Sequence, residues 1–371
     1  MNAHQNYRTF LNEMNNAFID RTAEVEILGT ALVAEENAVL VGPPGTGKSL
    51  LAEAFAKALQ EKFFSYLITR YTTPDELLGH FSLKELKDND QYVRQFENKL
   101  PDCSIAFLDE VFKASSALLN SLLTILNERK VDLGNGVRQK TPLKMVIGAS
   151  NEYPFQDESL GALWDRWLFR KHVNPLRKPD HIIRLITDKE LGNVLTKLDA
   201  DDLVTLRQDR DNVDLSDVAE SIIELHQFLL SKEIYVSPRR WRKVAKVIQS
   251  RSIMEGRSKA TTKDMRILSD VLWNKPEQRD QIAGFLANLC SGELLEVMKL
   301  HDAACEIIDT TNLSEEIEQN LSSVARKNKL LQQIAKDAAA KENGDPEISE
   351  YIAKINNYSA AFKKALRDAL S

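Results

Sequence analysis

The sequence predicts an α/β fold: a parallel sheet with covering helices up to about residue 178, followed by two all-α regions. Two observations predict the sheet. Strand-like apolar runs alternate with helix-like segments, and the runs are nearly continuous in apolar residues, as in parallel strands covered on both faces. A third observation predicts the rest of the chain, because from residue 179 onward the strand signals fade and apolar residues recur at helical spacing.

Four apolar runs are expected to form the strands: "AVLVG" (38–42), "FFSYLIT" (63–69), "SIAFLDE" (104–110) and "LKMVIGASN" (143–151). They place a first domain at residues 1–178. Residues 179–275 are predicted to form a smaller all-α domain, because "DVAESIIELHQFLL" (217–230) and "RRWRKVAKVIQSRSI" (239–253) have helical periodicity. A chain of 371 residues is long enough for two or three domains.

The last region, residues 276–371, is predicted to form three long helices in an antiparallel bundle. Six apolar residues of its final segment fall on one helix face: Ile348, Ile352, Ile355, Phe362, Leu366 and Leu370. The stretch "NGDPE" (343–347) separates the last two helices, with Asp345 as an N-cap and Pro346 in the first turn. The apolar stripes fit a partner platform, a brace between subunits and a spacer equally.

The composition excludes several classes of site. Cys103, Cys290 and Cys305 lie far apart and are odd in number, which argues against a disulfide framework or a CxxC metal site. The six histidines form no HExxH pair. A net charge of −6 provides no electrostatic footprint for nucleic acid. Since there is no signal-peptide core and no apolar run of roughly 18 residues, we expect no membrane insertion and a cytoplasmic location.

A phosphate-binding loop is the clearest motif in the chain. Residues 42–49, "GPPGTGKS", fit the pattern GxxxxGK[ST] between a predicted strand and a predicted helix. The glycines allow consecutive backbone N–H groups to curl around a phosphate, and the helix directs its positive end at the anion. The residues expected to bind the nucleotide are Gly42, Pro43, Pro44, Gly45, Thr46, Gly47, Lys48, Ser49 and Leu50.

Polar side chains end two of the other predicted strands. Asp109 and Glu110 follow "IAFL", at the carboxyl edge where open α/β sheets bind ligands. We expect Asp109 and Ser49 to hold Mg²⁺, and Glu110 to orient and deprotonate the attacking water. Asn151, at the end of its strand, can hydrogen-bond the γ-phosphate or that water without adding negative charge.

Two arginine pairs complete the set of candidate residues. "LWDRWLFR" contains Arg166 and Arg170, and "VSPRRWRK" contains Arg239 and Arg240 at a predicted helix start. A charge-stabilising arginine is a recurrent element of phosphoryl transfer. Taken alone, each of these arginines is better explained as a surface ion-pair residue.

The chain resembles the AAA+ ATPases in its motifs and in their order. These motifs are the phosphate-binding loop, the Asp-Glu strand end, the strand-end Asn, the "DR" and the "SPR". Four stretches look like the MoxR family within them: "TTPDELLG" (72–79), "FLDEVFKASSALLNSLLTILNER" (107–129), "ASNE" (149–152) and "LWDRWLFR" (163–170). "YLITRYTTPDELLGHFSLKELKD" and "VSPRRWRK" look like its RavA-type branch, the regulatory ATPase variant A group. The resemblance covers residues from about 18 to 275.

The resemblance implies an AAA+ αβα core at 1–178, an all-α lid at 179–275 and an interaction region at 276–371. Asn151 matches sensor 1, and Arg239 matches sensor 2, which couples lid closure to the γ-phosphate. Arg166 matches the arginine finger, which reaches into a neighbouring subunit's site and so implies a ring, usually a hexamer. ATP with Mg²⁺ is the implied cofactor, and a von Willebrand A-type protein is the implied partner.

Two insertions are also implied, at residues 80–100 and as a β-hairpin at 130–141 with a Gly-Asn-Gly turn. Each insertion fits two interpretations: an element that faces the pore or a partner, and a hairpin surrounded by solvent. One departure from RavA is that residues 276–371 read as helix throughout, where RavA carries a β-rich insertion. Partner contacts made through that insertion cannot be carried over.

The sequence is compatible with three functions: an ATP-driven remodeller of proteins, a DNA-linked motor, and a scaffold in which ATP only controls assembly. The acidic balance and a hairpin with only Lys130, Arg138 and Lys140 argue against the motor. Intact Glu110, Asn151 and Arg166 disfavour a scaffold that does not hydrolyse ATP. "TKLD" (196–199) echoes a guanine-specificity motif, but a match this short is common.

Overall fold

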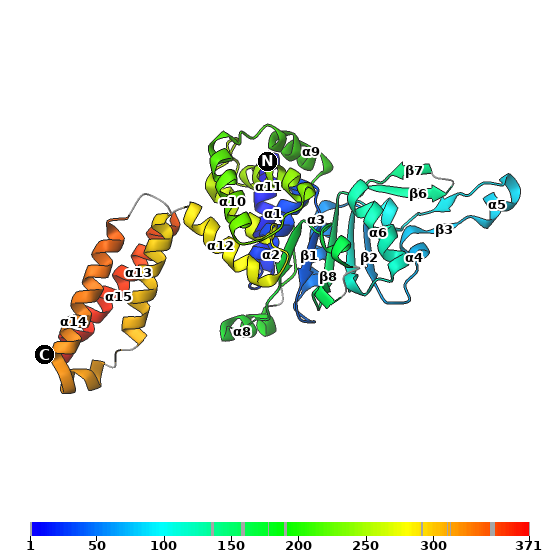
Figure 1. The fold of residues 1–371 in the computed structure, drawn as a ribbon. Coiled ribbons are helices and arrows are strands. Elements are labelled where there is room, and N and C mark those ends of the chain that lie inside the picture. The colour runs from blue at the N-terminus through cyan, green and yellow to red at the C-terminus, as the bar shows by residue number, and fades with distance from the viewer. Residues whose placement is uncertain are drawn as a thin grey trace. The chain divides into compact units, whose positions relative to one another are not determined.

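The computed structural model describes residues 2–134, 137–156, 160–176, 178–188, 191–290, 292–309, 311, 313–341 and 346–370. The chain forms two compact units, residues 1–282 and 283–371. Figure 1 shows the elements of both units by label.

A five-stranded parallel sheet forms the centre of the first unit. Its strand order is β2-β5-β8-β1-β9, and every neighbouring pair is parallel. The strands are β1 (Ala38–Val41), β2 (Phe63–Leu67), β5 (Ile105–Asp109), β8 (Met145–Ser150) and β9 (Phe169–His172). The carboxyl ends of β1, β5 and β8 therefore lie at one edge of the sheet, as the sequence predicts.

The central strands are buried throughout, which explains their continuous apolar sequences. All residues of β1 and β8 are buried. Helix α2 (Thr22–Ala34) packs against β1 and β9, and α3 (Lys48–Leu59) packs against β5 and β8. The helices α1 (Ala3–Ala17), α6 (Ser116–Glu128) and α7 (Gly161–Trp164) complete the α/β part. This α/β arrangement confirms the predicted fold class.

Two details of the sheet differ from the sequence prediction. Strand β2 is an edge strand with alternating exposure, so it is not covered on both faces as its apolar residues suggest, and it ends at Leu67 rather than at residue 69. The fifth strand, β9, was not among the predicted runs. It carries Arg170 and Lys171 among its four residues, and such a short charged segment does not resemble a buried strand.

Both predicted insertions are visible, and both extend toward the same side of the first unit in Figure 1. Residues 80–100 contain the antiparallel pair β3 (His80–Phe81) and β4 (Arg94–Gln95), with α5 (Leu83–Asn89) between them. The element before them is α4 (Pro74–Leu78). The predicted hairpin is β6 (Lys130–Gly134) paired with β7 (Val137–Lys140). Its Asn135-Gly136 turn lies outside the described residues.

A group of helices follows the sheet in the first unit. They are α8 (Pro179–Thr187), α9 (Ala200–Asp211), α10 (Ala219–Ser231), α11 (Pro238–Met254) and the 3-10 segment η6 (Thr262–Asp270). Helix α11 begins cleanly because Ser237 caps it, accepting from the Arg240 N–H at 3.3 Å, and Pro238 occupies its first position. This helical group has the all-α character predicted for residues 179–275.

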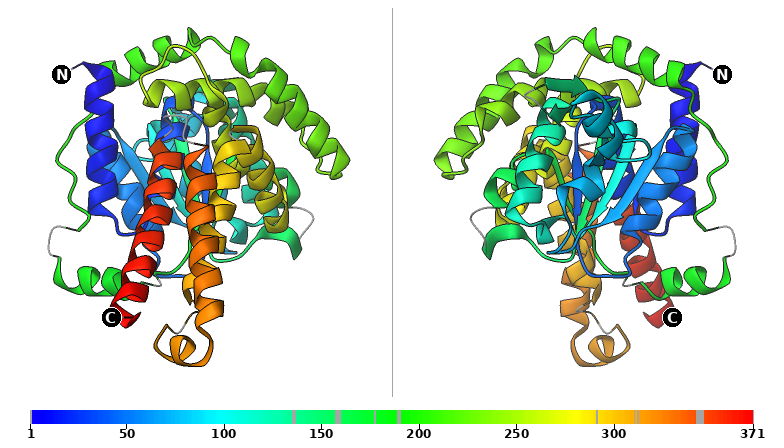
Figure 2. Two further views of the ribbon diagram at one scale, coloured as in Figure 1. Left: turned by 90° about the vertical axis from the view of Figure 1, so that its left-hand side faces the viewer. Right: turned by 90° about the vertical axis from the view of Figure 1, so that its right-hand side faces the viewer.

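The described residues of 276–371 form four helices rather than the three predicted: α12 (Pro276–Cys290), α13 (Gly292–Asp309), α14 (Leu313–Ala339) and α15 (Pro346–Leu370). The last three lie side by side, with successive helices running in opposite directions (Figures 1 and 2). Their shared core contains four of the six predicted stripe residues, Ile348, Ile352, Ile355 and Phe362, with Leu366 packed against it. The proposed cap Asp345 lies outside the described residues.

Within the described parts of the chain, no helix is long and apolar enough to cross a bilayer.

Candidate active site

The loop between β1 and α3 has the conformation that its glycines permit. Gly45 (φ 75°) and Gly47 (φ 84°) are left-handed, and a Cβ atom at either position would meet no atom within 4 Å. Backbone conformation, rather than crowding, therefore requires glycine there. Gly47 caps α3 without a side-chain hydrogen bond, so the first N–H groups of the helix are available for an anion.

Lys48 is held inside this loop. Its side chain is buried, and Nζ donates to the carbonyl oxygens of Gly42 at 2.7 Å and Pro43 at 2.9 Å. Burial lowers the pKa of Lys48, and the negative charges of Asp109 and Glu110 act in the opposite direction. The two strand-end carboxylates are thus close enough to Lys48 to stabilise its charge.

Asn151 lies between Lys48 and Glu110. Its Nδ2 donates to Glu110 Oε1 at 2.5 Å, and its Oδ1 lies 3.4 Å from Lys48 Nζ. Lys113 Nζ is 3.4 Å from the same Glu110 oxygen. The structure therefore brings together the predicted polar residues from the ends of β1, β5 and β8, which are far apart in sequence.

Glu110 has a backbone conformation that is unusual for its residue type. Its φ is 53°, in the left-handed region, and its N–H donates to Asp109 Oδ1 at 2.9 Å. Non-glycine residues adopt this region at an energetic cost, and they do so more often at functional sites. Because of this conformation, the backbone turns away from the direction of β5 at Glu110, directly after Asp109.

Arg21 also belongs to this region, although no sequence pattern predicts it. Arg21 is buried, and its Nε and Nη2 donate to the carbonyl oxygen of Thr46 at 3.2 and 3.1 Å. Its Nη2 also donates to the Asn174 carbonyl oxygen at 3.0 Å. The side chain thus ties the phosphate-binding loop to the segment after β9. Its position at the start of α2, in "FIDRTAEVEIL", does not reveal this role.

The residues present fit a magnesium nucleotide. Mg²⁺ in such sites takes one or two protein oxygens and completes its shell with phosphate and water. Ser49 and Asp109 offer a hydroxyl and a carboxylate oxygen, and Ser49 is exposed at the start of α3. No group of three or more His, Cys, Asp or Glu side chains among the described residues forms a metal cage.

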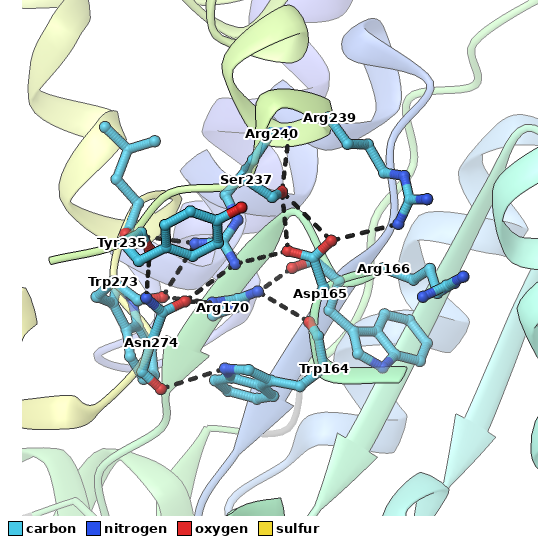
Figure 3. Close-up of polar contacts among 12 residues, drawn as sticks. Trp164, Asp165, Arg166, Arg170, Tyr235, Ser237, Arg239, Arg240, Trp273 and Asn274 are labelled. Carbon is cyan, nitrogen blue, oxygen red and sulfur yellow. Dashed lines mark hydrogen bonds and ion pairs between the residues drawn. The ribbon is translucent and has the colours of Figure 1, made fainter. Parts of the chain in front are cut away.

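A second cluster gathers all four predicted arginines around Asp165 (Figure 3). Asp165 Oδ1 accepts from Arg240 Nη2 at 2.9 Å, and Oδ2 accepts from Arg239 Nη1 at 3.3 Å. Ser237 Oγ donates to the same carboxylate at 3.1 Å. Arg166 follows Asp165 directly and donates from Nη1 to the Ala162 carbonyl oxygen at 2.6 Å. Two guanidinium groups, those of Arg239 and Arg240, thus bond to one carboxylate, and those of Arg166 and Arg170 lie near enough to interact with its charge.

Arg170 and Arg240 are interior members of this cluster. Arg170 is fully buried, and it donates to the main-chain oxygens of Trp164, Trp167 and Trp273. Its guanidinium also lies over the Trp164 ring at 4.5 Å. These contacts make Arg170 a packing residue rather than the surface ion-pair residue that its sequence allows.

Arg166 and Arg239 are the members of the cluster that reach solvent. The Arg239 side chain is 41% exposed, and Arg166 is half-buried. Burial lowers the pKa of Arg166, and the positive charge of Arg239 lowers it further. Within the described residues, no hydrogen bond or ion pair joins Arg166 or Arg239 to Lys48, Glu110 or Asn151 of the same chain.

Comparisons with known proteins agree with this geometry. The family model of the MoxR domain in MoxR-vWA-beta-propeller ternary systems matches residues 5–201, which is more than half of the chain. This chain belongs to the MoxR family of AAA+ ATPases. An AAA lid domain model also matches residues 217–286, within and just beyond the predicted lid.

Individual relatives support the family assignment. An uncharacterized protein of Methanocaldococcus jannaschii is 38% identical over 303 residues, which cover 81% of each chain. A chaperone of Mycobacterium tuberculosis, MoxR1, is 23% identical over 194 residues, which cover 50% of this chain and 49% of the relative. A crystal structure from Cytophaga hutchinsonii, described as an ATPase, has a TM-score of 0.61 at 18% identity and covers 77% of this chain and 94% of its own. That structure supports the fold.

Proposed function

We propose that copies of this MoxR-family protein assemble into a ring, a hexamer as is usual in the family. The ring would hydrolyse ATP and use the energy to remodel a protein partner. The observation that carries the proposal is the separation of two complementary half-sites. Lys48, Glu110 and Asn151 form one, and Arg166 and Arg239 form the other, and among the described residues no hydrogen bond or ion pair joins the two within one chain. A head-to-tail neighbour would bring the arginines of one subunit to the nucleotide of the next.

Each residue of the first half-site has a chemical task. Lys48 and the N–H groups at the start of α3 bind the β- and γ-phosphates. Glu110 accepts a proton from the attacking water and orients it, and Asn151 fixes Glu110 through the 2.5 Å hydrogen bond. When bound through Ser49 and Asp109, Mg²⁺ would neutralise charge on the phosphates.

The charge of the arginine cluster supports action on a neighbouring nucleotide. Four guanidinium groups and one carboxylate leave an excess of positive charge, and part of it is exposed on Arg166 and Arg239. Such a surface attracts a phosphate anion. The resemblance to sensor 2 implies that Arg239 couples lid closure to the γ-phosphate. Because Arg239 lies beside Arg166, we propose instead that both arginines bind the nucleotide of the neighbouring subunit.

An exposed apolar helix also supports assembly into a ring. None of the residues of α8 is buried, and its exposed side chains include Ile182, Ile183, Leu185 and Ile186. Arg184 on this helix donates to the Asn16 carbonyl oxygen at 2.5 Å, close to the segment that leads into Arg21 and the phosphate-binding loop. A helix with this much exposed apolar surface is typical of an interface. We propose that α8 packs against the neighbouring subunit.

The partner is proposed from the comparisons. The matching family model is described by its ternary systems with vWA and beta-propeller proteins, and the relative MoxR1 is described as a chaperone. We therefore propose a cytoplasmic, chaperone-like ATPase that acts on a von Willebrand A-type partner, with residues 1–178 as core, 179–275 as lid and 276–371 as interaction region. The RavA-type branch is part of this proposal and rests on "VSPRRWRK" and residues 66–88.

The experiment combines turnover with partner binding. The purified protein is assayed for ATP hydrolysis alone, with single-stranded DNA, and with a purified von Willebrand A-type protein from the same organism. We expect magnesium-dependent hydrolysis and ATP-dependent co-elution with the von Willebrand A-type protein. Stimulation by single-stranded DNA at physiological salt, without protein co-elution, would instead indicate a DNA-linked motor. A ring that assembles with ATP but never turns it over would indicate a scaffold.

A further inference from the structure

Asp165 joins the α/β part of the first unit to the start of a lid helix. It lies at the end of α7, and all three of its side-chain partners come from the first turn of α11. These partners are Ser237, Arg239 and Arg240, with donor–acceptor distances of 2.9 to 3.3 Å. The positive end of the α11 dipole also faces this carboxylate, which adds to the attraction.

The two arginines bind Asp165 in different ways. Arg240 is 3% exposed and has further acceptors, the Asn274 Oδ1 at 3.1 Å and the Leu272 carbonyl oxygen at 3.3 Å. Arg239 has Asp165 as its partner and is largely in solvent. The contact with Arg240 is therefore a fixed, buried connection, whereas the contact with Arg239 can open without exposing a buried charge.

Arg166 interacts with the same carboxylate through charge. Arg166 is the next residue in the chain, and its Nη1 donates to the Ala162 carbonyl oxygen, one turn earlier in the same helical segment. The guanidinium groups of Arg166 and Arg239 repel each other, and the negative charge of Asp165 attracts both. Asp165 therefore offsets the repulsion that would drive the two exposed arginines apart.

We propose that Asp165 is a positioning residue, which holds Arg166 and Arg239 at the spacing needed by the neighbour's nucleotide and fixes that spacing to the lid through Arg240. The inference rests on the proposed trans role of Arg166. Asp165 contacts no substrate in this account. When a phosphate of the neighbour's nucleotide arrives, Arg239 exchanges the Asp165 carboxylate for it, while Arg240 keeps the lid helix attached.

The test is Asp165→Asn, which removes the charge but keeps the size of the side chain. We expect unchanged ATP affinity and a kcat at least about tenfold lower, a part of the roughly 10³- to 10⁵-fold effect that a finger arginine itself supplies. The informative measurement mixes D165N with Lys48→Ala, a variant that has intact arginines but a defective loop. Since the D165N loop is intact, 1:1 mixing should restore up to about a quarter of the wild-type rate.

A matched control separates positioning from general stability. Asp270 is also a largely buried carboxylate that bonds two cations, Arg279 at 2.6 Å and Lys171 at 3.4 Å, but it contacts neither Arg166 nor Arg239. Asp270→Asn should lower thermal stability and leave kcat within about twofold of wild type. An equal loss of kcat in both variants would overturn the proposal, because general loosening would then explain the effect.

A second variant serves if D165N does not fold. Ser237→Ala removes one donor to Asp165 and the cap of α11 but leaves both arginines, so it should show a smaller loss of kcat at unchanged ATP affinity. If Arg166→Ala is rescued by K48A while folded D165N is not, or if S237A keeps the wild-type kcat, the positioning role is wrong and the trans site stands. If Arg166→Ala is not rescued either, the proposed ring site is wrong.

Discussion

Asn151 donates a hydrogen bond to Glu110 at 2.5 Å, although the two residues end different strands and lie 41 positions apart. The same amide presents its oxygen to Lys48 at 3.4 Å. One neutral side chain therefore links the expected base to the expected phosphate-binding lysine, and it does so without adding a negative charge beside a phosphate.

Glu110→Gln should retain ATP binding and lose turnover. The amide keeps the size of the side chain and can still bond Asn151, but it cannot accept the proton of the attacking water. A general base contributes typically about 10²- to 10⁴-fold, so we expect kcat to fall by at least about 10². Binding of a fluorescent ATP analogue and steady-state hydrolysis measure the two effects. Undiminished hydrolysis would contradict the role of Glu110.

Gly79→Ala should disturb the insertion at residues 80–100. Gly79 has a φ of 92°, and a Cβ atom there would lie 1.9 Å from the Gln95 carbonyl oxygen at the base of the β3–β4 pair. We expect a loss of about 1–3 kcal/mol in the free energy of unfolding, measured with urea. Gly284→Ala is the matched control, because its Cβ meets nothing within 4 Å inside a helix. Equal stability of the two variants would contradict this expectation.

Charged residues on α8 should prevent assembly without unfolding the subunit. Ile183 and Ile186 are 59% and 79% exposed, so replacing both by Asp removes little buried apolar area. Light scattering with ATP should show a smaller oligomer at an unchanged melting temperature. Leu330→Asp, at an exposed apolar position of α14, is the control. If L330D rather than the α8 variant dissociates the oligomer, the C-terminal bundle is the brace between subunits.

Alkaline pH should destabilise the region before β5 through Cys103. The thiol is buried, its Sγ lies 3.2 Å from the Leu100 carbonyl oxygen, and burial raises its pKa from 9.0 to about 12. The unfolded thiol loses its proton above pH 9 while the folded thiol keeps it, so stability falls as pH rises. Between pH 9 and 10 the loss should be about 1 kcal/mol.

The control for this pH effect is Cys103→Ala, which should be less stable at pH 7 but lose less stability between pH 9 and 10. Urea unfolding at the two pH values gives the comparison. Identical pH slopes in the variant and the wild type would exclude the thiol as the cause.

The meeting of Lys48, Glu110 and Asn151 could be predicted from the sequence because these residues belong to local patterns. The loop has its own motif, and Asp109, Glu110 and Asn151 each end an apolar run. Since parallel strands end at one sheet edge, the meeting of these residues follows from the fold class. For these residues, the local sequence patterns and the positions in the tertiary structure agree.

The arginine cluster could be predicted only in part. Periodicity places Arg239 and Arg240 at a helix start, but it does not tell which of two adjacent arginines turns inward to Asp165, 75 positions earlier. Arg170 is buried because Trp164, Trp167 and Trp273 offer it main-chain oxygens, and such oxygens leave no signal in the sequence. The fourth helix of residues 276–371 was missed because Ala- and Leu-rich helices follow each other with short connections.

The most direct test of the trans site mixes two inactive variants. Arg166→Ala keeps its own loop and Lys48→Ala keeps its own arginines, so neither should hydrolyse ATP alone. Random 1:1 mixing places an intact loop beside an intact arginine at about one junction in four, so we expect up to about a quarter of the wild-type rate. A mixture that assembles into rings and stays inactive at every ratio would contradict it.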